Sequence, residues 1–406
     1  MTQNNNIPQG YKKTEIGIIP QEWEVKRIKD VCKVDANSLT AKTSPDYEFE
    51  YISLSDVDSD LFEISTSRQI FKSAPSRARR IVKKEDVVIS TVRPNLQGFF
   101  RVKDDKKNLI ASTGFAVLTP IGCDSRYLLS CFFSNVISKQ FYSLVVGSNY
   151  PAVNSSDVAK LKLAVPPMEE QRKIAEILGM WDEAIERQSR LIEKLELRKR
   201  ALMQRLLTGR TRLPGFTAPW QKVKLGEIFK ERNETKCEYL PLLSITAERG
   251  VILQSESDKK DTSNDDKSKY KRICPNDIGY NTMRMWQGRS ALSAMEGIVS
   301  PAYTIVTPKA EVDPLFISEL IKQPRVVYDF WTHSQGLVGD TLNCKFHDFS
   351  QVKVAIPSLP EQKAIAEVLT TADDEIATNR KKLDALRLQK RGLMQQLLTG
   401  KTRVKM

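Results

Sequence analysis

The chain has 406 residues, of which 40% are hydrophobic and 28% are charged, and its formal net charge is +13. This length suits two or three domains with sizeable cores, and the composition is that of an ordinary soluble protein. No stretch resembles a signal peptide or reaches the length of a membrane span, so we expect a cytoplasmic protein with no membrane partner.

The cysteines and the distribution of charge give two further indications. The six cysteines form no CxxC pair and are read as reduced thiols. The positive charge is spread along the chain, with no basic tail. Any affinity for nucleic acid must therefore come from local clusters on folded surfaces.

The first part of the chain predicts a lead-in and a globular domain. Residues 1–19 are polar and punctuated by glycine and proline. Residues 20–165 contain short β-type runs bounded by turn residues, with a helical patch at 127–141, and indicate a compact α+β or β-rich domain. Its densest basic cluster comprises Arg77, Arg79, Arg80, Lys83 and Lys84.

Residues 166–210 predict one long helix. Two prolines precede it and Gly209 follows its last apolar residue, which are typical helix boundaries. Apolar residues recur in steps of four and three, which is the pattern of a coiled-coil seam. Gln188 and Lys199 interrupt this seam, and we take such polar positions as a hypothetical device for fixing register.

Residues 211–356 repeat the layout of the first domain. The segment DVVISTVRPNLQG at 86–98 corresponds to DIGYNTMRMWQG at 277–288, with a gap of one residue. This alignment places Arg93 opposite Arg284 and Gln97 opposite Gln287. Residues 55–76 and 140–156 diverge freely from 247–270 and 329–347. The pattern indicates one scaffold that carries different loops.

Residues 357–406 repeat the long helix and end in a C-terminal tail. Residues 361–403 match 170–212 without a gap at a constant offset, and about half of the positions are identical, which marks an internal repeat. Asn379 and Lys390 interrupt this seam at the matching places. Each helix has one apolar stripe, so the two helices most economically pack against each other, and the connectivity then requires them to be antiparallel. A generic dimerisation coil is the alternative.

No catalytic constellation is recognisable. Gly400, Lys401 and Thr402 end like a phosphate-binding loop, but Gln395 stands where glycine is needed. No nuclease or amino-methyltransferase motif is present, and the two histidines are too few for a zinc site. We therefore expect no enzyme activity and no metal in this chain.

Two variable domains, each followed by a near-duplicate helix, resemble the specificity subunit of type I restriction-modification systems. The motifs that carry the resemblance are PPMEEQRKIAEIL with LMQRLLTG, PSLPEQKAIAEVL with LMQQLLTG, and the opening GYKKTEIGIIPQEW. The implied fold class is α+β, with two target-recognition domains separated and joined by two long antiparallel coiled-coil helices in a pseudo-twofold repeat.

The resemblance also implies partner subunits, with recognition in this chain and catalysis in the partners. The implied ligand is double-stranded DNA with a bipartite target, and each globular domain reads one half. Two methyltransferase subunits, and restriction subunits in the full complex, are the implied partners. This chain would hold no cofactor, because S-adenosylmethionine, ATP and Mg would belong to those partners.

The residues expected to contact DNA follow from this reading. Shared positions are better candidates for phosphate contacts or scaffold than for base discrimination, whereas base readout is expected in the divergent loops. The candidates are Arg77, Arg79, Arg80, Arg93, Gln97, Asn149, Tyr150, Asn154, Lys271, Arg272, Arg284, Gln287, Gln335 and Asn343. Structural ion pairs, solvated charged faces and plain turns are the competing interpretations. A non-catalytic scaffold that spaces two protein-binding domains, or a subunit of a fused restriction enzyme, remains an alternative for the whole chain.

Overall fold

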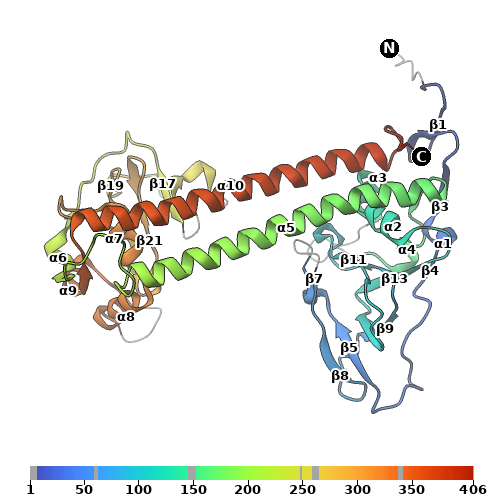
Figure 1. Cartoon of the computed structure of the whole chain (residues 1–406), viewed down its shortest axis with the longest axis horizontal. Helices are drawn as coiled ribbons and strands as arrows, with labels where there is room; N and C mark the ends of the chain where they lie inside the picture. Colours follow the sequence, from blue (N-terminus) through green and yellow to red (C-terminus); the bar gives the residue numbers. More distant parts are fainter. Residues whose placement is uncertain are drawn as a thin grey trace. The chain divides into compact units, whose positions relative to one another are not determined.

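The computed structural model describes residues 7–58, 63–144, 152–246, 249–257, 265–336 and 342–405. The chain divides into two compact units (Figure 1). Unit 1 comprises residues 1–193 and 378–406, and unit 2 comprises residues 194–377. Each unit therefore contains one globular body together with part of both long helices.

Unit 1 is built on two four-stranded sheets. The sheet orders are β11-β10-β13-β4 and β8-β5-β12-β9, and β12 runs parallel to β5. Its elements before the long helix are β1 (Tyr11–Thr14), β2 (Gly17–Pro20), β3 (Glu24–Arg27), α1 (Ile28–Val31), β4 (Cys32–Val34), β5 (Glu48–Ile52), η1 (Leu54–Asp56), β6 (Val57–Asp58), β7 (Glu63–Ile64), β8 (Ser67–Ile70), β9 (Ala78–Val82), β10 (Val87–Ser90), η2 (Pro94–Leu96), β11 (Phe99–Arg101), β12 (Leu109–Ser112), β13 (Phe115–Pro120), α2 (Ser125–Phe132), α3 (Asn135–Leu144), α4 (Ser155–Val158) and β14 (Lys162–Val165).

Unit 2 repeats one of these sheets and replaces the other. Its four-stranded sheet has the order β16-β23-β20-β21, which matches β4-β13-β10-β11 strand for strand, whereas β17-β18 and β19-β22 form separate two-stranded sheets. Its elements are β15 (Gln221–Lys224), α6 (Leu225–Ile228), β16 (Phe229–Arg232), β17 (Leu243–Thr246), β18 (Gly250–Leu253), η3 (Gln254–Glu256), β19 (Lys271–Ile273), β20 (Ile278–Asn281), η4 (Met285–Gln287), β21 (Ser290–Leu292), β22 (Gly297–Val299), β23 (Tyr303–Pro308), α7 (Pro314–Leu320), α8 (Pro324–His333), α9 (Phe346–Gln351) and β24 (Lys353–Ile356).

The two long helices are α5 (Met168–Leu206) and α10 (Leu359–Leu397), each of 39 residues. Their carboxyl ends lie just before the glycines expected to mark the helix boundaries. The glycines that follow, Gly209 and Gly400, have φ of +68° and +70°, the left-handed conformation that commonly ends a helix. At Gly400 space is also limiting, because an added Cβ would lie 2.4 Å from the ring of Pro20.

Within each unit, the segments of α5 and α10 run antiparallel, as the ion pairs between them show. In unit 1, Lys390 on α10 pairs with Asp182 on α5. In unit 2, Lys199 on α5 pairs with Asp373 on α10 at 2.6 Å. The two pairs are formed by residues that correspond in the internal repeat. The seam lysines are therefore neutralised across the helix pair by a repeated aspartate.

A second polar contact crosses the helix pair in unit 1. The side chain of Gln188 donates a hydrogen bond of 2.8 Å to the side-chain oxygen of Asn379. These two residues are counterparts in the repeat, and Gln188 is 6% exposed. This bond gives the buried Gln188 amide a partner on the opposite helix, which supports the hypothesis that this polar layer fixes the register.

Each body packs its core around the start of one long helix. In unit 1 the fully buried Trp23 and Tyr127 pack with Ile174 and Leu178 of α5, and Leu397 of α10 joins the same cluster. In unit 2 the corresponding cluster contains Ile365 and Leu369 of α10 and Leu206 of α5. The apolar stripe of each helix thus packs against the body near the start of the helix and against the other long helix further along.

Candidate nucleic-acid interface

A repeated Glu-Gln dipeptide anchors each long helix to its body. The Gln171 amide accepts from the backbone N–H of Asp124, the residue that caps α2, and donates to the carbonyl of Pro166. Gln362 makes the same two contacts, with Asp313 and Pro357. Both glutamines are almost fully buried, so they hold the helix start rigidly against the body.

The glutamate of the dipeptide holds the tail of the opposite helix. In unit 1, Arg403 forms a two-pronged ion pair with Glu170 at 2.7 and 3.0 Å, and the indole of Trp23 donates to the same carboxylate. In unit 2, Arg212 contacts both oxygens of Glu361 at 2.6 Å. These hydrogen bonds raise the pKa of Arg212 and of Arg403 above the ordinary arginine value.

The sequence interpretation did not assign these roles. It used the Glu-Gln dipeptide only as a mark of resemblance, and it gave no function to Arg212 or Arg403. A signal was available, because all of these residues are identical in the two copies of the repeat. The two bodies are therefore fixed to the helices by the same buried chemistry, which leaves the loops free to differ.

The basic cluster of unit 1 does not form a single cationic face. Alternate residues of a strand point to opposite sides, and Arg79 and Arg80 are neighbours on β9. Arg80 pairs with Asp35 at 2.8 Å and is 23% exposed, so the ion-pair interpretation is supported for it. The guanidinium of Arg79 lies 4.9 Å from the ring centre of Phe71. Arg77 is exposed and stays a candidate DNA contact.

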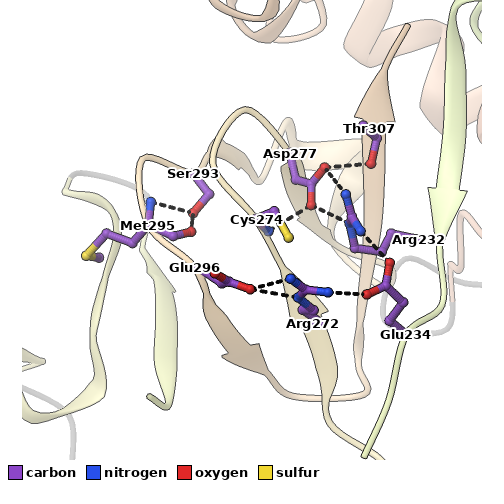
Figure 2. A network of polar contacts seen from close by, with 9 residues as sticks. All are labelled: Arg232, Glu234, Arg272, Cys274, Asp277, Ser293, Met295, Glu296 and Thr307. Atoms are coloured by element: carbon purple, nitrogen blue, oxygen red, sulfur yellow. Dashed lines mark hydrogen bonds and ion pairs between the residues drawn. The ribbon is translucent and has the colours of Figure 1, made fainter. Parts of the chain in front are cut away.

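The counterpart in unit 2 is a network rich in carboxylates (Figure 2). Arg272 pairs with Glu234 at 2.7 Å and with Glu296, and hydrogen bonds from its guanidinium to these carboxylates raise its pKa. Arg232 pairs with Asp277 at 2.7 Å and with Glu234.

Carboxylates outnumber guanidinium groups in this network, so Arg272 is a poor candidate for a phosphate contact. The network also reaches Thr307, whose hydroxyl donates to Asp277 at 2.6 Å, and so ties β19 to β23 through its shared acids. Lys271 precedes Arg272 on β19 and points to the other side of the strand. It stays a candidate contact.

The loops after β10 and β20 match at their arginines but not at their glutamines. Arg93 and Arg284 each stand directly before a short 3-10 helix, η2 and η4. Gln97 is the residue that follows η2, whereas Gln287 is the last residue of η4. The expected equivalence of the two glutamines is therefore wrong by one residue, because Gly288 takes the place of Gln97 with φ of +72°.

The unit 1 loop adopts an uncommon backbone. Arg93 and Gln97 have φ of +49° and +53°, values that are unfavourable for residues with a side chain. Two such residues within five positions are a candidate functional feature.

The remaining candidates lie on the divergent loops. Asn154 directly precedes α4, and its backbone N–H donates to Asp157, which supports a capping role. Gln335 donates to Asp348 at 3.0 Å and exchanges backbone hydrogen bonds with Asn343. The side-chain oxygen of Asn343 is buried without a partner among the described residues. Asn149 and Tyr150 lie outside the described residues.

Two negative findings concern the described residues only. Across the described ranges, no three His, Cys, Asp or Glu side chains gather into a group that could hold a metal ion. None of the helices within those ranges is long and apolar enough to span a membrane.

The chain thus contains two bodies that share the same anchoring contacts, carry different loops and are joined to repeated helices. A family model for the type I restriction modification DNA specificity domain matches residues 20–197 and 306–388. The chain belongs to this family and is a DNA sequence-recognition subunit, in which specificity is separate from catalysis.

Relatives match along the whole chain. The putative type I restriction enzyme MjaX specificity subunit of Methanocaldococcus jannaschii is 28% identical and is covered to 97%, with 98% of this chain aligned. The MjaIX specificity subunit of the same organism is 23% identical, with 97% of this chain and 96% of that protein aligned.

Solved structures share the fold. A chain from a structure that describes complex assembly and conformational transition of the type I R-M system has a TM-score of 0.63 and 21% identity, with 95% of this chain and 99% of that chain covered. The type I restriction-modification S subunit of M. genitalium has a TM-score of 0.54 and 14% identity, over 100% and 99% of the two chains.

Proposed function

We propose that each body binds one half of a bipartite DNA target and that the paired long helices set the spacer between the halves. The observation that carries this proposal is the repeated anchoring by Glu170 and Gln171 in unit 1 and by Glu361 and Gln362 in unit 2. Identical anchors beneath different loops suit two domains that must be held alike but read different sequences.

The proposed architecture is a pseudo-twofold repeat in which the helices form an antiparallel coiled coil. The support for this architecture is that the same ion pair occurs in both units. Lys390 pairs with Asp182 in unit 1, and their counterparts in the repeat, Lys199 and Asp373, pair in unit 2. A helix of 39 residues is roughly 60 Å long, against about 34 to 36 Å for one turn of DNA. We propose target-recognition domains at 20–165 and 211–356, a spacer helix at 166–210, and a second spacer helix with the C-terminal tail at 357–406.

The proposed partners supply the chemistry. Two methyltransferase subunits would dock on equivalent surfaces of the repeat, because a repeated body offers the same surface twice. Adenine methylation within a duplex requires the base to leave the stack, so the active site and its S-adenosylmethionine belong to those subunits. ATP and Mg belong to restriction subunits in the full complex, and the assembly acts in the cytoplasm.

Among the candidate DNA contacts, we propose that Arg77, Lys271 and Arg284 reach phosphates, because all three lie at least partly exposed. Arg80 and Arg272 are assigned to the scaffold. The fused-enzyme and protein-scaffold alternatives gain no support from a specific contact.

A salt titration tests this assignment. The chain assembled with its modification subunits is expected to bind a bipartite duplex with an affinity that falls steeply as salt rises. Arg284→Ala should weaken binding and reduce the slope of log K against log salt by about 1. Arg272→Ala should keep the slope and cost about 1 kcal/mol of unfolding free energy in urea. An absence of duplex binding at every salt concentration would instead favour the protein scaffold.

A further inference from the structure

Two large aromatic side chains lie exposed on one face of α8, which is labelled in Figure 1. Tyr328 is 58% exposed and Trp331 is 48% exposed, and their ring centres are 5.6 Å apart. The opposite face of the helix is buried through Val326 and Phe330. The core therefore does not use the two rings, and a neighbouring pair of exposed aromatic rings is typical of a contact surface.

The loop around η4 continues this surface. The end of η4 packs on α8, because a Cβ added to Gly288 would lie 3.1 Å from Val327. The indole N–H of Trp286 donates to the carbonyl of Met283 at 2.9 Å, which closes the loop on itself. Met283 and Arg284 are exposed on that loop. The loop is therefore held in place beside the rings without a ligand.

The charge of this surface is positive. Arg284, Arg289 and Arg325 are exposed, and none of them forms an ion pair with another residue in the described part of the chain. The one acid of α8 is the half-buried Asp329. The arginines of the β16 and β19 network are bound to carboxylates, so the two sets of arginines have different roles.

We propose that the α8–η4 surface, formed by Arg284, Arg289, Arg325, Tyr328 and Trp331, contacts duplex DNA, with the two rings against bases and the arginines on phosphates. This proposal rests on the proposed function. Guanidinium groups around exposed rings match a ligand that has an anionic backbone and apolar groups at its base edges. A single helix also fits the major groove, where thymine methyl groups offer apolar contacts.

The corresponding helix of unit 1 presents different chemistry. α3 follows α2 as α8 follows α7, and its exposed side chains include Asn135, Lys139 and Ser143. These side chains are polar, unlike Tyr328 on α8. The sequence of α3 also contains an aromatic residue, Tyr142, so the chemistry of the two helices differs only in part.

The test uses the chain assembled with its modification subunits. The Tyr328→Ala/Trp331→Ala variant is compared with wild type and with Tyr239→Ala, which removes an aromatic side chain of unit 2 that is 80% exposed, on the loop before β17. The measurements are subunit stoichiometry by native mass spectrometry, the methylated motif by sequencing of plasmid DNA, and the methylation rate of a cognate duplex.

The double variant is expected to assemble normally and to methylate the cognate duplex at least about tenfold more slowly, since losing the recognition of one base pair costs roughly that factor. Its motif should become degenerate in one half only. The single variant Trp331→Phe keeps an aromatic ring and should retain most of the wild-type methylation rate. Tyr239→Ala should methylate at the wild-type rate.

Three results would overturn the inference. Loss of a modification subunit from the double variant would make the surface a protein interface. An unchanged methylation rate and motif would show that the α8–η4 surface does not take part in recognition. Degeneracy in both halves of the motif would show that its role is not confined to one half-site. If the wild-type complex methylates no bipartite motif, the proposed function itself is refuted. This result differs from the other three because it does not depend on the variant.

Discussion

Deleting residues 185–191 together with 376–382 is expected to shorten the spacer of the methylated sequence and to leave both half-sites unchanged. The deleted segments are counterparts in the repeat and contain Gln188 and Asn379. The Lys390–Asp182 and Lys199–Asp373 ion pairs lie outside them and can re-form. Seven residues of helix span about 10 Å, or roughly three base pairs.

The measurement is the motif read by sequencing methylated DNA from cells that express the variant with its partners. Deleting only one of the two segments is the control, because it puts the helices out of register and should abolish methylation. An unchanged spacer in the double deletion would show that the helices do not set it.

Arg403→Ala is expected to lower the free energy of unfolding of unit 1 by about 3 kcal/mol, because it leaves the buried carboxylate of Glu170 without its cation. Arg212→Ala should have a similar effect on unit 2 through Glu361. Denaturation in urea followed by circular dichroism measures both. Arg391, exposed on α10, provides the control, since Arg391→Ala should change stability by less than about 0.5 kcal/mol.

A double variant separates the ion pair from simple packing. Glu170→Met/Arg403→Met removes both charges and should cost less than the sum of the two single changes, because no unpaired buried charge remains. Costs that add, or a loss below about 0.5 kcal/mol for Arg403→Ala alone, would contradict the role of the ion pair in holding the end of α10.

The long helices could be predicted from sequence because their signals are local. Apolar spacing, prolines before the helix and a glycine after it all lie within one segment, and α5 and α10 begin two residues after the predicted starts. The carboxyl ends lie at Leu206 and Leu397, three residues before Gly209 and Gly400, the glycines expected to mark these boundaries. The antiparallel direction followed from connectivity and agrees with the ion pairs within each unit.

The bodies and their binding surfaces depend on distant residues and were harder to predict. β4 pairs with β13 across a long separation in the chain, and no local pattern specifies such a partner. The sequence around Arg272 shows three nearby cations but not Glu234 and Glu296, which the fold brings to it. Tyr328 and Trp331 could have been noticed, because the spacing of Val326 and Phe330 places both rings away from the buried stripe.

We propose that this chain selects the DNA sequence for an adenine methyltransferase. The most direct measurement is a genome-wide methylation map by single-molecule sequencing, from cells that carry the gene and from cells that lack it, with all partner genes retained. We expect one bipartite adenine-methylated motif to disappear on deletion of the gene and to return when the gene is restored. A map that is identical with and without the gene, while the partners are expressed, would contradict it.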